Sequence, residues 1–235
     1  MSIRKHESNA HKQRYYRQNK ALRCIDTVTQ LQTALPESVP DGVQASFLPA
    51  PDVAVSSDDN YTPPHVISAA RAALGVIDLD PASSLFAQRT VQAAQWCGLD
   101  HPDPDRRNGL AVTWYGRVWC NPPFSKDSTN PDGFLKLFTK KLVDAYLCGD
   151  VRAACILTRC DSSAAYSQLL RQHSTASCWP AQRLNFIRPT HLDRKGNPNF
   201  TTIIWYLGRA SHRFIAAFER IGDTRANPTE STHRG

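Results

Sequence analysis

The sequence predicts an α/β protein with a doubly wound sheet, because strands and helices are expected to alternate along the chain. Short apolar runs that suit buried strands recur between stretches with helical spacing. Two of these runs end directly in a polar motif, one at Asp80 and the other at Asn121. Doubly wound sheets bind ligands at the carboxyl ends of their strands, so we expect both motifs to lie at one edge of the sheet.

The first elements follow from the positions of proline and glycine. Thr62-Pro63-Pro64 predicts the start of a helix, with Thr62 as the N-cap and Pro63 as the first helical residue, and Gly75 predicts its end. Residues 76–80 then predict a short strand. A βαβ unit takes about 30 residues or more, so at most one further strand fits before the apolar run at residues 117–120. We therefore expect an abbreviated sheet.

The later elements follow from apolar spacing. Residues 117–120 predict a second buried strand, residues 151–158 a third, and residues 200–207 a long hydrophobic late strand. Helical spacing is found in residues 133–147 and 164–173. This alternation supports the doubly wound sheet.

The two ends of the chain differ in composition from its middle. Residues 33–59 are rich in Pro, Ser, Asp and Ala and lack a helical period, which predicts a flexible linker. The preceding residues 1–32 form a basic N-terminal arm, residues 60–221 the folded domain, and residues 222–235 a polar, disordered tail. A chain of 235 residues has room for one full core.

The positive charge of the chain is concentrated in the arm. The net charge is +7, and residues 1–23 alone contain seven basic residues and one acidic residue. Such an arm can neutralise nucleic-acid phosphates without reading sequence, or it can serve as a solubilising tail. The arm residues that we assign to nucleic-acid binding are Arg4, Lys5, Lys12, Arg14 and Arg17.

Neither a membrane segment nor a metal site is expected. The sequence has no run of 18 or more apolar residues and its N-terminus is polar, so we expect a cytoplasmic protein. The seven cysteines lack the close C-x-x-C pairs of zinc sites. We interpret them as reduced thiols, most of them packed in the core.

Asn121-Pro122-Pro123-Phe124 is the strongest functional motif. Two prolines fix φ at adjacent positions directly after an apolar run, which predicts a rigid, extended turn. In such a turn the Asn121 side-chain oxygen and the Pro122 carbonyl can together accept both hydrogens of an amino group. Phe124 can offer a flat face to an extruded base. The alternative is a strand-ending proline turn with Phe124 anchored in the core.

The motifs resemble those of the phage-type DNA N-6-adenine methyltransferase family over residues 60–207. Asn-Pro-Pro-aromatic is the catalytic signature of amino-methyltransferases, and further blocks occur in order around it. They are Tyr61-Thr62-Pro63, Asp78-Leu79-Asp80-Pro81-Ala82-Ser83, Asn108-Gly109-Leu110 followed by Trp114, Ile156-Leu157-Thr158-Arg159-Cys160-Asp161, and Arg183-Leu184-Asn185-Phe186.

The resemblance implies a Rossmann-like methyltransferase sheet and transfer of a methyl group from S-adenosylmethionine to the exocyclic amino group of adenine in DNA. Residues 60–221 would then be the catalytic domain, and Asn121 to Phe124 its catalytic loop. The chain departs from the usual pattern, because no G-x-G follows the first strand. The residues that the resemblance assigns to the cofactor are Tyr61, Thr62, Pro63, Asp78, Asp80, Pro81, Ala82 and Ser83.

Acidic residues in two loops are candidates for supporting roles. Asp100, Asp103 and Asp105 can serve the ribose of the cofactor, or they can be solvated loop acids. Asp161, after the third strand, either braces the site or caps the following helix.

Target recognition is expected from loops, because the catalytic domain leaves no chain for a separate DNA-reading domain. Residues 125–132 lie beside the catalytic turn, and residues 188–199 carry Arg188, Arg194 and Lys195, which can address guanine edges. We expect a short or relaxed target and a protein encoded by a phage or prophage. The alternatives are methylation of RNA bases or of protein glutamine, and an inactive nucleic-acid-binding relative.

Overall fold

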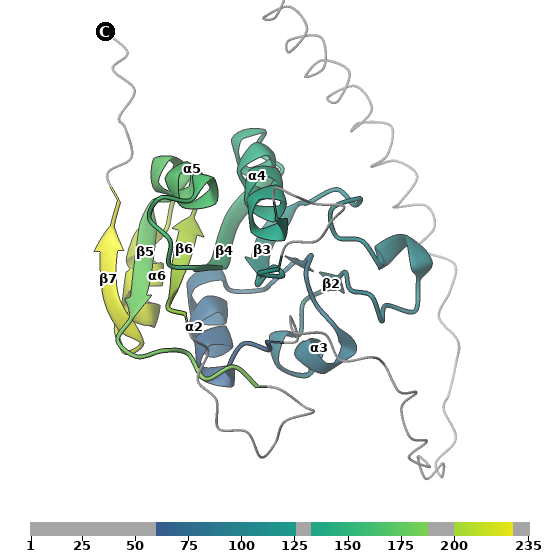
Figure 1. The fold of residues 1–235 in the computed structure, drawn as a ribbon, viewed down its shortest axis with the longest axis horizontal. Helices are drawn as coiled ribbons and strands as arrows, with labels where there is room; N and C mark the ends of the chain where they lie inside the picture. The colour runs from purple at the N-terminus through teal and green to yellow at the C-terminus, as the bar shows by residue number, and fades with distance from the viewer. Residues whose placement is uncertain (1–59, 126–132, 188–199, 228–235) are drawn as a thin grey trace, which may run out of the picture. The chain divides into compact units, whose positions relative to one another are not determined.

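The computed structural model describes residues 60–125, 133–187 and 200–227, which belong to one compact unit, Val53–Gly235. These residues form a seven-stranded sheet with helices on both faces (Figure 1). The predicted arm, the linker, Arg188, Arg194 and Lys195 lie outside the described residues. Within the described ranges, no helix is long and apolar enough to cross a membrane.

Helices and strands alternate through the first two thirds of the described chain. The helices are α2 (Pro64–Leu74), α3 (Leu85–Val91), α4 (Phe134–Leu147), α5 (Ala165–His173), α6 (Ser211–Phe218) and the 3-10 helix η1 (Pro104–Arg106). The strands are β1 (Leu79–Asp80), β2 (Gln95–Trp96), β3 (Gly116–Cys120), β4 (Val151–Arg159), β5 (Ala176–Pro180), β6 (Thr202–Leu207) and β7 (Gly222–Ala226).

The strand order is β2-β1-β3-β4-β6-β5-β7. β2, β1, β3 and β4 are parallel neighbours, whereas β6 is antiparallel to both β4 and β5, and β7 is antiparallel to β5. The predicted α/β class is confirmed, and the sheet is mixed and compatible with a Rossmann-like fold. One strand, β2, lies between the first strand and the one before Asn121, as the chain length predicts.

The core forms two layers because successive residues of a strand point to opposite faces of the sheet. In β4, Cys155 and Leu157 pack with α2 and α6, while Ala154 and Ile156 pack with α4 and α5. The apolar face of α2, which includes Val66, Ile67 and Ala70, is buried in the first of these layers. Of the six cysteines in the described part, all are free thiols and four are buried, in agreement with the prediction.

The boundaries of the first elements differ from the prediction. The N-cap of α2 is Pro63, so the helix starts one residue later than expected, and Thr62 is buried instead of capping it. Gly75 ends the helix as predicted, with φ at +83°, a conformation that glycine adopts readily. The first strand is shorter than predicted, Leu79–Asp80, although Asp78 also exchanges backbone hydrogen bonds with Arg117 and Gln95 just before it.

The C-terminal part is more ordered than predicted. The predicted tail at residues 222–235 is corrected, because Gly222–Ala226 form β7 and pair with β5 along their whole length. No residue of this edge strand is buried, and its sequence, Gly-Asp-Thr-Arg-Ala, has too few apolar residues for a strand to be recognised. The helix α6 and the strand β5 were also not predicted.

Candidate functional site

The sheet changes its winding direction between β1 and β3. From β1 the chain passes through α3, on the α2 face, to β2 at the edge of the sheet. From β3 it passes through α4, on the opposite face, to β4 on the other side. A switch of this kind opens a ligand site outside the carboxyl ends of the two strands. Asp80 ends β1 and Asn121 follows β3, so both predicted motifs lie at this point.

Asp80 is a buried carboxylate held by neutral groups. Its side chain accepts hydrogen bonds from the Ala82 backbone N–H at 3.3 Å and from Gln88 Nε2 at 3.0 Å. Burial raises the pKa of Asp80 to about 7, and the hydrogen bonds from Ser83, Ala82 and Gln88 offset only part of that rise. A carboxylate in such surroundings gains from a cationic ligand, which would restore its charged form at neutral pH.

The turn after Asp80 is pressed against a neighbouring loop. Ser83 N–H donates to the Cys97 carbonyl at 2.7 Å, and Ser84 caps α3 by accepting from Ala87 N–H at 3.1 Å. A Cβ added to Gly98 would lie 2.0 Å from the Ser83 carbonyl oxygen, and one added to Gly109 1.8 Å from that of Pro81. The turn after Asp80 has no G-x-G. The glycines that permit close backbone approach, Gly98 and Gly109, therefore lie in the loop opposite the turn.

Asn121 is tied to the start of the domain. Its Nδ2 donates to the Asn60 carbonyl at 2.9 Å, and since a carbonyl accepts only, this bond fixes which end of the amide is nitrogen. The neighbouring Tyr61 exchanges two backbone hydrogen bonds with Ile187, at 3.0 and 2.9 Å. The Tyr61 ring packs on Phe86 of α3 with centroids 4.6 Å apart. The predicted Tyr61 and Asp80 blocks are thus brought together with Asn121.

Phe124 belongs to a cluster of three phenylalanines. Its ring meets Phe200 edge-on at 5.3 Å and Phe186 edge-on at 6.4 Å between centroids. Phe124 is half-buried: its ring packs against the core, as one alternative of the sequence analysis predicts, and part of it stays exposed. Phe186 and Phe200 flank residues 188–199, a segment outside the described residues.

Cys120, directly before Asn121, is not suited to act as a nucleophile. Its side chain is fully buried, and burial together with the nearby Asp80 charge raises the pKa of its thiol well above the usual value. Thiolate is the reactive form, so this cysteine stays protonated and inert at neutral pH. At the end of β3, the groups that can take part in chemistry are therefore the Asn121 side chain and the main-chain carbonyls that follow it.

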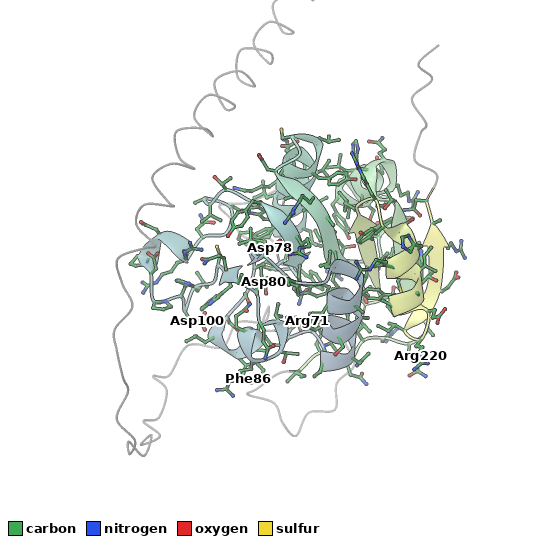
Figure 2. All side chains as sticks on the ribbon, turned by 180° about the vertical axis from the view of Figure 1, so that it is seen from behind. Arg71, Asp78, Asp80, Phe86, Asp100 and Arg220 are labelled. Carbon is green, nitrogen blue, oxygen red and sulfur yellow. The ribbon has the colours of Figure 1, made fainter. Side chains whose placement is uncertain are left out.

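Asp78, unlike Asp80, forms ion pairs with arginine side chains. Its Oδ2 accepts from Arg117 N–H at 2.8 Å and Nε at 3.0 Å, and Arg152 lies 3.5 Å away. Burial alone would raise its pKa, but Arg117 and Arg152 outweigh that effect and hold the pKa of Asp78 below the usual value. Figure 2 shows Asp78 and Asp80 one above the other, with Asp100 and Phe86 on the Asp80 side. These bonds favour a structural role for Asp78.

The loop acids have different surroundings. Asp100 Oδ2 accepts from Leu85 N–H at 2.9 Å, and its Oδ1 is buried without a hydrogen-bond partner. Asp103 caps η1, where its Oδ1 accepts from Asp105 N–H at 3.0 Å. Asp161 accepts from the Ser163 hydroxyl at 2.7 Å in the turn before α5, while Ala164 is the N-cap of that helix. Of the ribose candidates, only Asp100 contacts the start of α3.

Several residues of the site were not predicted from the sequence. Gln88 holds Asp80 and Ser83, Asn60 holds Asn121, and Phe86 contacts Tyr61. Gln88 and Phe86 follow the Asp80 turn closely, but their spacing does not show that Gln88 turns back to that turn or that Phe86 meets Tyr61 from another segment. Phe200 was interpreted only as the start of the late strand.

Comparison with known proteins adds no family to this description. No protein-family model matches the chain, and neither a curated protein nor a solved structure matches it.

Proposed function

We propose that this protein transfers a methyl group from S-adenosylmethionine to the exocyclic amino group of adenine in DNA. The observation that carries the proposal is the meeting of two motifs at the switch point: the buried Asp80 carboxylate at the end of β1 and the anchored Asn121 amide after β3. The Asp80 carboxylate suits a cationic ligand, and the Asn121 amide suits an amino group bound next to that ligand. The sheet then serves as an abbreviated methyltransferase sheet.

The chemistry of the residues around Asp80 fits the cofactor. S-adenosylmethionine supplies an electrophilic methyl group on a sulfonium centre and carries a cationic amino group. Asp80 would bind that amino group, directly or through water, because its present partners are neutral. The buried, unpaired Oδ1 of Asp100 can accept a hydrogen bond from a ribose hydroxyl. The tight contact of Gly98 and Gly109 with the turn supports a rigid wall for the ligand.

The turn at Asn121 suits the adenine amino group. The Asn60 carbonyl takes the amide nitrogen of Asn121, which leaves Oδ1 as the acceptor of that side chain. With the Pro122 carbonyl it would draw the amino nitrogen toward tetrahedral geometry and free its lone pair. Phe124 would stack on the base. Holding two reactants in such a pose can lower the barrier by about 7–11 kcal/mol.

DNA is favoured as the substrate by the charge of the chain. The net charge of +7 suits nucleic acid more than protein glutamine, and the resemblance of the motifs is to DNA enzymes. The proposal includes the basic arm and the loop residues Arg188, Arg194 and Lys195 as DNA contacts, and a place in the cytoplasm of a bacterial host.

A methyl-transfer assay with the full-length chain tests the proposal. Tritiated S-adenosylmethionine is offered with duplex DNA, RNA or a glutamine-containing peptide, and digested DNA is analysed for the methylated nucleoside. We expect label in DNA, recovered as N6-methyladenine. Label in RNA or peptide alone would assign another substrate, and cofactor binding without transfer to any of them would assign an inactive relative.

A further inference from the structure

Arg159 ends β4 beside the candidate active site. β3 and β4 are parallel, with Cys120 opposite Ile156, so Asn121 and Arg159 both lie at the carboxyl edge of the sheet. In the strand order β1-β3-β4, Asp80 and Arg159 lie on opposite sides of Asn121. Arg159 is exposed.

The guanidinium of Arg159 rests on an aromatic platform. Its central carbon lies 4.8 Å from the centre of the Phe200 ring, and Phe200 in turn packs edge-on against Phe124. Stacking uses the flat face of the guanidinium and leaves the N–H donors around its edge available. The Phe200 ring therefore lies between the positive charge of Arg159 and Phe124 of the Asn-Pro-Pro-Phe motif.

The charge of Arg159 has no carboxylate partner in the part of the chain that the structure describes. Within the described ranges, no carboxylate lies at ion-pair distance from it. Asp161, two residues further on, is bonded to Ser163, and Arg159 has only the smallest influence on its pKa, which is lowered chiefly by Ser163. Arg152, at the amino end of the same strand, is paired with Asp78. A planar, exposed guanidinium without a carboxylate partner is suited to bidentate binding of an oxyanion.

We propose that Arg159 binds a backbone phosphate of the DNA strand that carries the target adenine. This inference rests on the proposed function, which puts the cofactor on the Asp80 side of Asn121 and the extruded base at Asn121 and Phe124. The β4 side is then the side from which the strand arrives. The anion at Arg159 is accordingly a phosphate and not the carboxylate of the cofactor, and Phe200 is the positioning residue that holds the guanidinium in place.

Binding measurements on the full-length chain test the inference. Fluorescence anisotropy follows a labelled adenine-containing duplex from about 50 to 200 mM salt, with wild type, Arg159→Met, Arg159→Lys and the control Arg152→Met, which removes the same charge from the other end of β4. We expect Arg159→Met to weaken binding about tenfold at low salt and to reduce the log–log salt slope by about one. Arg159→Lys should restore the slope but only part of the affinity, because lysine lacks the planar fork.

The outcomes separate this inference from the proposed function. Unchanged affinity and slope in Arg159→Met, a slope equally reduced in Arg152→Met, or a loss confined to one base sequence would each contradict the phosphate contact. So would a loss of S-adenosylmethionine affinity in calorimetry, which would move the anion to the cofactor. If the wild type lacks methyl transfer but Arg159→Met still lowers the slope, the proposed function fails and the phosphate contact stands. Absence of DNA binding by the wild type would overturn both.

Discussion

Asp78 and Asp80 are two residues apart, yet their carboxylates have opposite surroundings. Asp78, just before β1, is bonded to Arg117 and lies near Arg152, and its pKa is lowered. Asp80, at the end of β1, is bonded to neutral groups, and burial raises its pKa to about 7. Both residues belong to the block Asp78 to Ser83, so their different pKa shifts come from their places at the two ends of β1. Asp78 lies at the amino edge of the sheet and Asp80 at the carboxyl edge.

The two ends of β4 show the same contrast with the opposite charge. Arg152 at the amino end pairs with Asp78, whereas Arg159 at the carboxyl end rests on Phe200 without a carboxylate at ion-pair distance among the described residues. The paired residues Asp78 and Arg152 thus lie at the amino edge, whereas Asp80 and Arg159, which have no oppositely charged partner among the described residues, lie at the carboxyl edge. A buried charge without a partner costs folding energy, which applies to Asp80, whereas the exposed guanidinium of Arg159 is solvated by water. This comparison is the basis for our proposal that charged ligands bind at the carboxyl edge.

The largest expected effect is on catalysis at the carboxyl edge. Asn121→Ala should lower the rate of methyl transfer at least a hundredfold, because it removes the proposed acceptor, while cofactor affinity stays within about twofold. Asn121→Asp keeps an acceptor but loses the donor to the Asn60 carbonyl, and should be partly active. Single-turnover rates and calorimetry measure the two quantities. Wild-type turnover in Asn121→Ala would exclude this residue from the chemistry.

The next effect is on the pH dependence of stability. The raised pKa of Asp80 means that the folded state retains a proton between about pH 4 and 7 that the unfolded chain has released. The contribution of Asp80 to stability is therefore greatest below that range and is lost as pH rises through it. We expect a fall of roughly 2–4 kcal/mol in the free energy of unfolding. Asp80→Asn should largely abolish this fall, as measured by urea unfolding at pH 5 and pH 8.

Asp78→Asn is the matched control for that measurement. The lowered pKa of Asp78 means that its stabilisation is present above about pH 4 and is lost as pH falls further. Asp78→Asn should cost about 1–2 kcal/mol at pH 7, since Asp78 and Arg117 are partly exposed, and almost nothing near pH 2. The same pH profile for both variants would remove the contrast between the two edges.

A smaller effect is expected from the loop that supports the Asp80 turn. Gly109→Ala would place a methyl group against the Pro81 carbonyl, so the turn must shift, at a cost of about 1–3 kcal/mol in stability and with loss of cofactor affinity. Gly149→Ala is the control: its φ of +81° makes alanine strained, but no atom lies within 4 Å of the added Cβ. Equal cofactor affinity in both variants would show that the turn is not part of the site.

The sequence predicted those parts of the molecule whose cause is local. Apolar spacing located α4, α5, the parallel strands β1, β3 and β4, and the late strand β6, but not β2. The proline and glycine around α2 placed that helix to within a residue. The Asp80 and Asn121 motifs were placed correctly at strand ends, because a polar residue directly after a buried run marks such an end.

The parts that were missed depend on contacts between distant segments. β7 has few apolar residues and exists because its backbone pairs with β5. Asn60 binds Asn121 from 61 residues away, and the ion pair that distinguishes Asp78 from Asp80 comes from Arg117, 39 residues away. The spacing of residues along the chain does not reveal which charged side chains will find an oppositely charged partner in the folded sheet.

Calorimetric titration of S-adenosylmethionine at several pH values tests the central claim, that the Asp80 carboxylate binds a cationic ligand. Binding should favour the ionised carboxylate, so affinity should rise roughly five- to tenfold from pH 6 to pH 7.5, with proton release seen in buffers of different ionisation enthalpy. Asp80→Asn should bind more weakly, without this pH dependence. Affinity that is independent of pH in the wild type, or no binding by the folded protein, would contradict the account.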